Sequence, residues 1–164
     1  MSSSTPELSA AVVTVSDSSS CGKRADLGGP AVAVALEKRN FKIVAREIVP
    51  DDQAAIRDTL TRLCSQARLV VTTGGTGIAQ RDVTPEATRA VCDRLVEGVS
   101  ERMRAEGLKS TKFAALSRAV CGVRGESVIL NLPGKPSGAL ESLEAVIDLI
   151  PHMLRLLSGD TTHD

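Results

Sequence analysis

The segment of this chain best suited to chemistry is a glycine-rich loop that follows a short β-rich run. Leu69–Thr73 predicts a strand, and the loop after it comprises Gly74, Gly75, Thr76 and Gly77. Because glycine bares the backbone, such a loop directs N–H groups toward an anion, usually a phosphate. The alternative is a tight turn that needs glycine for positive φ. We favour the phosphate interpretation, because an aspartate and a helix start follow the same loop.

Asp82 lies in that loop, beside Arg81, and a helix is predicted directly after it. We expect Thr84 to be the N-cap of this helix and Pro85 its first-turn residue. A carboxylate beside a bound phosphate is repulsive unless a cation intervenes, so Mg²⁺ is the expected mediator. The alternative role of Asp82 is to cap its own loop. The loop is neither a Walker A motif nor the dinucleotide fingerprint, since Gln80 stands where the latter needs a small residue.

Two more polar segments follow predicted strands. Asp51 follows Phe41–Val49 and could share Mg²⁺ with Asp82, although from local sequence alone it is more simply a first-turn helix acid. The second segment is stiffened by two prolines and offers Lys135 as a point charge. It predicts a second site for an anion or a polar ring, the alternative being a rigid strand-to-helix connection. Its candidate residues are Asn131, Pro133, Gly134, Lys135 and Ser137.

The composition excludes several classes of protein. The chain has 164 residues, 42% of them hydrophobic, with two Phe and no Trp or Tyr. The core is therefore expected to be aliphatic, and the shortage of stacking side chains argues against an RNA or single-strand binder. Twenty basic residues balance twenty acidic ones, so no net field draws the chain to nucleic acid or a membrane. With no membrane span, no signal pattern and no C-x-x-C spacing, we expect a cytoplasmic protein with reduced cysteines.

Strands alternate with helices along the chain, which predicts a three-layer αβα fold with a mainly parallel sheet and helices on both faces. The predicted strands are Ala10–Val15, Phe41–Val49 and Leu69–Thr73, followed by a hairpin of Val120–Val123 and Ser127–Leu132. The predicted helices are Ala31–Lys38, Pro50 to about Ala67, Thr84–Leu95, Glu97–Leu108, and an apolar-faced helix from an N-cap at Ser137, interrupted at Pro151. We expect one domain over residues 8–159, with disordered tails at 1–7 and 160–164.

The carboxyl ends of parallel strands share one edge of a sheet, and ligands of open α/β sheets bind there. Three polar loops are predicted to meet at that edge. They are Ser16–Gly22, which includes Asp17, the loop at Asp51, and Gly74–Asp82. The two aspartates, Asp51 and Asp82, are the candidate catalytic and metal-binding residues.

The order of these motifs resembles the molybdopterin adenylyltransferase family. The matching segments are Thr14–Asp17, Val49–Asp52, Thr73–Gly77, Arg81–Thr88, Leu116–Arg118 and Asn131–Gly134. The resemblance implies a homotrimer of α/β subunits that transfers AMP from ATP to the terminal phosphate of molybdopterin, with Mg²⁺, and releases pyrophosphate. A molybdenum-insertion protein is the further partner that it implies.

The same resemblance assigns roles to individual residues. Asp51 and Asp82 fall on the two essential aspartates of the family, Ser117 on its pterin-pocket serine, and Gly74–Gly77 on its phosphate loop. The residues that fall on its pocket-closing loop are Asn131, Pro133, Gly134 and Ser137. Substrate contacts are also expected from Ser16, Asp17, Arg81 and Lys135. Gly107 departs from the pattern, because relatives often carry a serine there.

Two other functions remain open at this stage. The first is a pterin-binding or carrier protein that does not adenylylate, which retention of both Asp51 and Asp82 disfavours. The second is an interaction scaffold that trimerises through the apolar face of its last helix.

Overall fold

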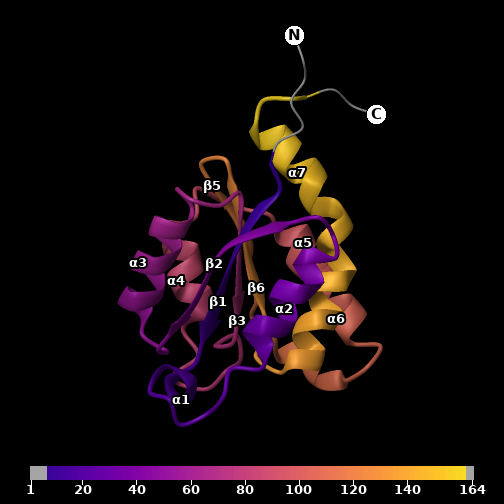
Figure 1. Cartoon of the computed structure of the whole chain (residues 1–164). Helices are drawn as coiled ribbons and strands as arrows, with labels where there is room; N and C mark the ends of the chain where they lie inside the picture. Colours follow the sequence, from indigo (N-terminus) through magenta and orange to yellow (C-terminus); the bar gives the residue numbers. More distant parts are fainter. Residues whose placement is uncertain (1–6, 162–164) are drawn as a thin grey trace.

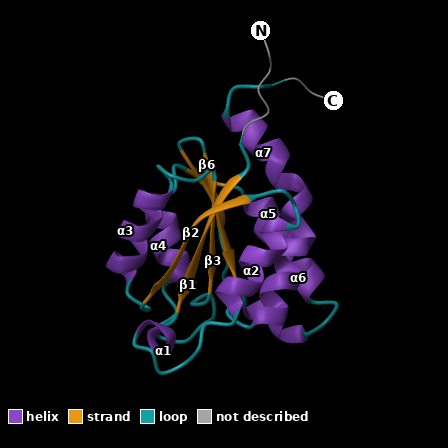
Figure 2. Cartoon of the chain, in the orientation of Figure 1, coloured by secondary structure: helices purple, strands orange, loops and turns teal. Residues whose placement is uncertain are grey.

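A six-stranded sheet forms the middle layer of the molecule (Figures 1 and 2). The computed structural model describes residues 7–161, so the predicted terminal tails lie largely outside the described residues. The strands run in the order β2-β1-β3-β6-β5-β4. Their bounds are β1 Ser9–Val15, β2 Lys42–Val49, β3 Leu69–Thr73, β4 Arg94–Leu95, β5 Cys121–Arg124 and β6 Ser127–Leu132. The first four in this order are parallel to one another, which confirms a mainly parallel sheet. Strand β5 pairs antiparallel with β6, and β4 pairs antiparallel with β5.

Helices cover both faces of the sheet, as Figure 1 shows. On one face lie α2 Gly28–Glu37, α5 Glu97–Gly107, α6 Pro136–Val146 and α7 Ile150–Leu157. On the other face α3 Gln53–Leu63 packs against α4 Thr84–Val91. A short helix, α1 Asp17–Ser20, lies with the loops at the lower end of the sheet in the view of Figure 1. None of the helices in residues 7–161 combines the length and apolar character needed to cross a membrane.

The core is aliphatic and divides into one cluster on each side of the sheet. β1 is buried along its whole length, as its unbroken apolar sequence predicts. β2 alternates between exposed and half-buried residues because it is an edge strand. Phe41 is buried, whereas the other aromatic residue, Phe113, is exposed. The strands predicted from apolar runs therefore form the buried centre of the fold.

The apolar face of the last helix packs inside the subunit. Leu143, Ile147, Ile150 and Leu154 belong to the core cluster, and only Leu140 of this face is counted among the exposed large side chains. The helix is interrupted by a 3₁₀ turn, Ile147–Leu149, directly before α7, which carries Pro151 in its first turn. The predicted interruption is thus confirmed, and the apolar face gives no support to a trimer contact.

Two predicted N-caps are wrong. Val83, not Thr84, precedes α4, and the Thr84 hydroxyl donates to the Gly74 carbonyl (2.9 Å) across the glycine loop. Lys135, not Ser137, precedes α6, because Pro136 already has helical geometry as its first residue. Thr84 does not cap α4 because its hydroxyl is bonded to the glycine loop. Ser137 does not cap α6 because the helix already begins at the proline before it.

Other differences come from contacts distant in sequence. The helix predicted over Thr84–Leu95 ends at Val91, because the chain then pairs with β5 through the hydrogen bonds Asp93 N to Val123 O and Val96 N to Cys121 O. That pairing makes the short edge strand β4. The helix predicted to reach Ala67 ends at Leu63. These ends are set by tertiary structure, which local propensity does not encode.

Candidate active site

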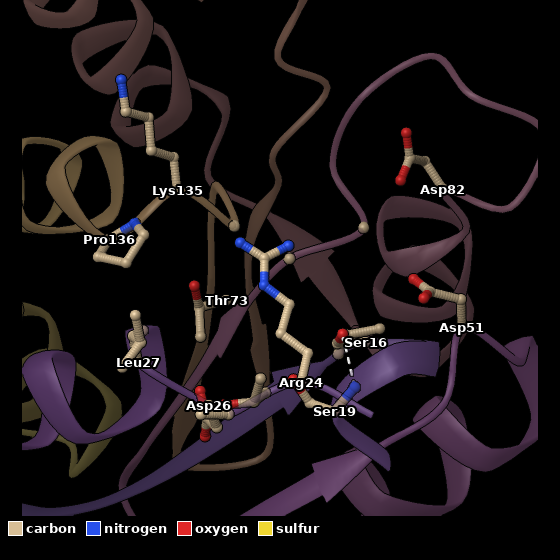
Figure 3. Close-up of a pocket in the computed structure, with 17 residues that line it drawn as sticks. Ser16, Ser19, Arg24, Asp26, Leu27, Asp51, Thr73, Asp82, Lys135 and Pro136 are labelled. Carbon is tan, nitrogen blue, oxygen red and sulfur yellow. Dashed lines mark hydrogen bonds between the residues drawn. The ribbon is translucent and has the colours of Figure 1, made fainter. Parts of the chain in front are cut away.

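Two adjoining cavities open where the parallel strands end, which is the edge that the polar loops were predicted to share. The first, about 450 Å³, lies between the end of β1, the loop that follows it, and the starts of α2 and α6 (Figure 3). Its polar and charged wall residues are Thr14, Ser16, Ser19, Arg24, Asp26, Asp51, Thr73, Asp82 and Lys135. Cationic side chains, carboxylates and hydroxyl groups therefore line this cavity together.

The second cavity, about 630 Å³, lies between the glycine loop, α5, the 3₁₀ segment Lys112–Leu116 and the start of α6. Its walls are largely apolar and comprise Ile78, Met103, Phe113, Ala114, Leu116, Ala119 and Pro133. Ser117, Thr76 and Gly77 also line it, beside Gly107. A flat ring with polar edges suits such a space, since apolar walls bury its faces while a few polar groups fix its orientation.

Four residues line both cavities and form the wall that the cavities share: Gly75, Asp82, Gly134 and Lys135. Two are glycines, so the backbone itself separates the two spaces. The other two bring one negative and one positive charge to the junction. A group bound in one cavity therefore lies next to a group bound in the other only at this wall.

Asp17 and Asp51 hold the ends of β1 and β2 together. The Asp17 N–H donates to Asp51 Oδ2 (2.9 Å), and the Asp51 N–H donates to Asp17 Oδ1 (3.0 Å). Arg81, from the glycine loop, donates two hydrogen bonds to the Asp17 carboxylate (2.6 and 2.9 Å). These bonds with Arg81 hold the pKa of Asp17 below its usual range. Asp17 thus connects three loops by hydrogen bonds, and it lines neither cavity.

Asp51 is not the first-turn acid that its local sequence suggested. Asp52 fills that role as the N-cap of α3, accepting from the Ala55 N–H (2.8 Å). Asp51 lines the first cavity instead. Burial raises the pKa of its carboxyl group above the ordinary value, and the nearby charges of Asp17 and Asp82 act in the same direction. A carboxylate held under such repulsion is suited to bind a cation.

Asp82 caps its own loop and also faces both cavities. Its Oδ2 accepts from the Ala79 N–H (3.0 Å), which caps the loop, and its side chain lines both cavities. In the view of Figure 3, Asp51 and Asp82 lie on the same side of the first cavity. The structure thus brings together the two aspartates that the sequence analysis selected.

The glycine loop is held by Arg118. Its N–H donates to Thr76 O (2.8 Å), and its guanidinium donates to Gly77 O (2.8 Å) and Asp82 O (2.7 Å) and pairs with Glu86. Both ends of the loop segment between Thr76 and Asp82 are therefore fixed by one residue. Nothing in the local sequence marks Arg118 as the residue that holds this loop, so its role becomes visible only in the folded chain.

The glycines serve the turn as well as any bound anion. Gly74 and Gly75 have positive φ (107° and 69°), and a Cβ on Gly75 would lie 2.3 Å from Thr84 Oγ1. The conformational interpretation of these two glycines is therefore supported. Within residues 7–161, the N–H groups of Gly75, Thr76 and Gly77 have no protein acceptor, so they are also available to an anion. These are loop amides rather than the start of α4, because the Thr84 N–H is bonded to Gly75 O.

Several other predicted residues take structural positions. Asn131 is fully buried, with its amide group donating to Thr72 and Thr88 hydroxyls and its Oδ1 accepting from the Val120 N–H. It lines neither cavity, and neither do Ser137, which is exposed, and Arg81, which is bound to Asp17. By contrast Ser16 and Gly74 line the first cavity, Pro133 and Ser117 the second.

The sequence analysis missed Arg24 in the first cavity and the apolar walls of the second. Arg24 lies in a loop without regular structure, so no periodicity signals it. The apolar wall residues resemble ordinary core positions in sequence. Met103 and Ala119 are indeed buried, but Ile78 and Phe113 are 70% and 66% exposed in the folded chain. That exposure distinguishes Ile78 and Phe113 from core residues, and only the structure reveals it.

The sequence and fold of this chain match those of known molybdopterin-related proteins. Residues 11–152 match the family model described as a probable molybdopterin binding domain. The chain is 43% identical over 153 residues to a molybdopterin adenylyltransferase of Helicobacter pylori strain J99, covering 91% of this chain and 87% of that protein. It is 41% identical over 165 residues to a molybdopterin adenylyltransferase of Escherichia coli K12, covering 90% and 84%.

Solved structures give the same result. The molybdopterin biosynthesis enzyme MoaB from Thermus thermophilus superposes with a TM-score of 0.87 at 47% sequence identity, covering 93% of this chain and 97% of that one. The chain belongs to the family of molybdopterin-binding domains. The three-layer fold and the family expected from the motif order are therefore confirmed.

Proposed function

We propose that this protein is a molybdopterin adenylyltransferase of molybdenum cofactor biosynthesis, which transfers AMP from ATP to the terminal phosphate of molybdopterin. The single observation that carries the proposal is the wall that two cavities of different chemistry share, with Asp82 and Lys135 in it. The named activities of the relatives in Helicobacter and Escherichia support it. Transfer between two substrates requires that they meet end to end, and the shared wall is the place where groups from the two cavities meet.

The cavities differ in the substrate part that each suits. The polar first cavity, with Arg24 and Lys135, suits the phosphate chain and ribose of the nucleotide. The apolar second cavity suits the tricyclic pterin, with Ser117 on its wall. In this arrangement we expect the terminal phosphate of molybdopterin to lie toward Gly75.

The reaction needs no strong base. A phosphate oxygen of molybdopterin attacks the α-phosphorus of ATP, a new P–O bond forms, and the bond to the β-phosphate breaks to release pyrophosphate with its electron pair. The nucleophile is already anionic, so the protein must hold two polyanions in line and neutralise their charge. The half-buried thiols of Cys64 and Cys92 offer no competing nucleophile, because desolvation raises their pKa to about 11 and they line neither cavity.

The two aspartates fit a shared Mg²⁺. Asp51 Oδ2 and Asp82 Oδ2 each accept a backbone N–H, whereas among the described residues no donor binds either Oδ1. The described chain holds no cluster of three or more acidic, His or Cys side chains that could bind a metal alone. Mg²⁺ commonly binds through one or two carboxylates and completes its shell with substrate phosphates and water. When bound, it supplies charge neutralisation at the phosphate oxygens.

The proposal extends to the setting of the reaction. We expect a homotrimer in the cytoplasm that passes its product to a molybdenum-insertion protein. Only the resemblance of the motifs supports the trimer. The apolar face of the last helix does not, because it packs within the subunit. Sedimentation equilibrium at micromolar concentration checks this part, and a monomer mass would contradict it.

The deciding experiment incubates the protein with ATP, Mg²⁺ and molybdopterin. We expect release of pyrophosphate and a product heavier than molybdopterin by one adenylyl group, measured by mass spectrometry. The second candidate function, a molybdopterin carrier that does not adenylylate, is favoured by the size and apolar walls of the second cavity alone. Tight binding of molybdopterin without pyrophosphate release would establish the carrier and overturn the enzyme.

A further inference from the structure

Arg24 is the one arginine near the cavities whose side chain has no partner within the described residues. Arg81 is bound to Asp17, and Arg118 to the glycine loop and Glu86. Arg104, on the wall of the second cavity, donates to the carbonyls of Ser117 and Ala119. In the described part of the chain, no hydrogen bond or ion pair involves the Arg24 guanidinium, which leaves its donors for a bound molecule.

The position of Arg24 directs its guanidinium N–H groups into the first cavity. Its side chain extends into the middle of the first cavity, with Thr73 and Leu27 on one side and Asp51 on the other in the view of Figure 3. Its backbone is anchored, because the Arg24 N–H donates to Ser18 O (3.2 Å). The guanidinium is therefore carried by a fixed turn and is not part of the wall shared with the second cavity.

The carboxylates near Arg24 do not already use it. Asp26, which also lines this cavity, accepts from the Thr14 hydroxyl (2.7 Å) and the Gly29 N–H (3.0 Å). Asp51 and Asp82 lie on the same wall as each other but form no ion pair with Arg24 among the described residues. A planar guanidinium with free donors, standing between hydroxyl groups and carboxylates, matches the geometry of a phosphate group that it can bind through two hydrogen bonds.

We propose that Arg24 binds the phosphate chain of the nucleotide in the first cavity and determines affinity for the nucleotide but not for molybdopterin. This inference rests on the proposed function, because it takes the first cavity as the nucleotide site. It also separates Arg24 from Lys135, which lines both cavities and serves both substrates.

The test compares Arg24→Gln with Arg24→Lys and with Lys23→Gln as the matched control. Lys23 is exposed, lies in the same turn and is bonded to the same Ser18 carbonyl (2.9 Å), but it lines neither cavity. Calorimetry with the non-hydrolysable α,β-methylene analogue of ATP, and separately with molybdopterin, measures affinity in the whole protein. Inorganic tripolyphosphate is a third probe, which isolates the phosphate chain from the nucleoside.

We expect Arg24→Gln to weaken binding of the analogue and of tripolyphosphate by about tenfold to a hundredfold, the range of a charged hydrogen-bonded pair. Arg24→Lys should lose less, because the charge remains, and Lys23→Gln should change affinity by less than about twofold. In turnover, KM for ATP should rise while KM for molybdopterin stays unchanged.

Three outcomes overturn the inference, and they are distinguishable. If the wild type binds the analogue and folded Arg24→Gln binds it equally well, Arg24 is not a phosphate ligand, although the proposed function stands. If Arg24→Gln weakens molybdopterin instead, its phosphate partner belongs to the other substrate. If the wild type itself does not bind the analogue, the proposed function fails and the inference fails with it.

Discussion

The two cavities that meet at Asp82 are built by different means. The first is walled by loops whose polar groups bond to one another, as in the exchange of hydrogen bonds between Asp17 and Asp51. The second is walled by apolar side chains, of which Met103 of α5 is buried whereas Phe113 and Leu116 of the 3₁₀ segment Lys112–Leu116 are exposed. Polar loops fix charges at defined positions, whereas an apolar wall provides area. The comparison therefore predicts that substitutions in the first cavity alter ion binding, chemistry and nucleotide affinity, and that those confined to the second alter mainly molybdopterin affinity.

The largest effect is expected at the shared wall. Asp82→Asn should lower kcat by about a hundredfold or more, because a neutral amide cannot balance a cation at the phosphates. Binding of the two substrates separately should persist, since the wall keeps its shape. Steady-state kinetics with calorimetry measures both, and Asp58→Asn on the exposed side of α3 is the control. Wild-type turnover by the variant would remove Asp82 from the mechanism.

A smaller effect that spans both cavities is expected at Arg118. Arg118→Lys loses the fork that bonds Gly77 O and Asp82 O, so the loop that both cavities share is loosened. We expect stability to fall by about 2 kcal/mol and KM to rise for both substrates together. Denaturant unfolding and kinetics test this, with exposed Arg57→Lys as control. A rise in KM for one substrate only would show that the loop does not serve the two cavities equally.

The two cavities should separate in a matched pair of truncations. Leu27 lines only the first cavity and Phe113 only the second, and each is 66% exposed. Phe113→Ala should weaken molybdopterin binding by about tenfold and spare the nucleotide, while Leu27→Ala should do the reverse with a smaller change. Because neither side chain belongs to the core, Tm should hold. If both variants affected the same substrate, the assignment of the cavities would be wrong.

The environment of Asp51 predicts an effect on stability that depends on pH. Its carboxyl pKa is raised by burial, so the contribution of this group to stability is present below the unfolded pKa of about 3.9 and is lost as pH rises through the higher folded value. An amide does not ionise, so Asp51→Asn avoids this loss of stability at higher pH. The amide oxygen can still accept the Asp17 N–H. The Asp51→Asn variant should therefore have the higher Tm at about pH 7, with the advantage shrinking toward about pH 4. Thermal unfolding across this range checks it, and an advantage that grew toward acid pH would contradict the sign.

The smallest effect is expected at Gly107, which lines the second cavity. A Cβ here would lie 2.9 Å from the Ala114 Cβ, so Gly107→Ser must push the 3₁₀ segment outward and reshape the second cavity. We expect molybdopterin affinity to change by about threefold or less, with nucleotide affinity unaffected. Gly98→Ser, also on α5 but with open space around its Cβ position, is the control.

The difference between the cavities also explains what the sequence predicts and what it does not. The strands β1 and β3 and the hairpin of β5 and β6 follow from apolar runs and turn residues, and the meeting of the loops at Asp17, Asp51 and Asp82 follows from parallel topology. The roles of the individual residues at that edge of the sheet do not follow from the sequence. Asp17 and Arg81 look like ligands in sequence but are bonded to each other, and Asn131 is a buried hydrogen-bonding residue.

The features that the sequence does not predict depend on contacts between segments far apart in the chain. Arg118 acts on the glycine loop, and β4 exists only because β5 lies beside it. Apolar wall residues of the second cavity obey the same pattern as core residues, and only incomplete packing makes them a binding surface. A sequence pattern reports which side chains face inward, but it does not report where the interior is left open.

The bonds of Asp17 have a consequence for how the molecule folds. They join residues separated by 34 and 64 positions in the chain, to Asp51 and Arg81. Closing such long loops costs chain entropy before the contacts compensate for it, so these bonds form only once β1, β2 and β3 are in register. The cavity edge is then completed late in folding, and during refolding the recovery of ligand binding should trail the recovery of strand structure.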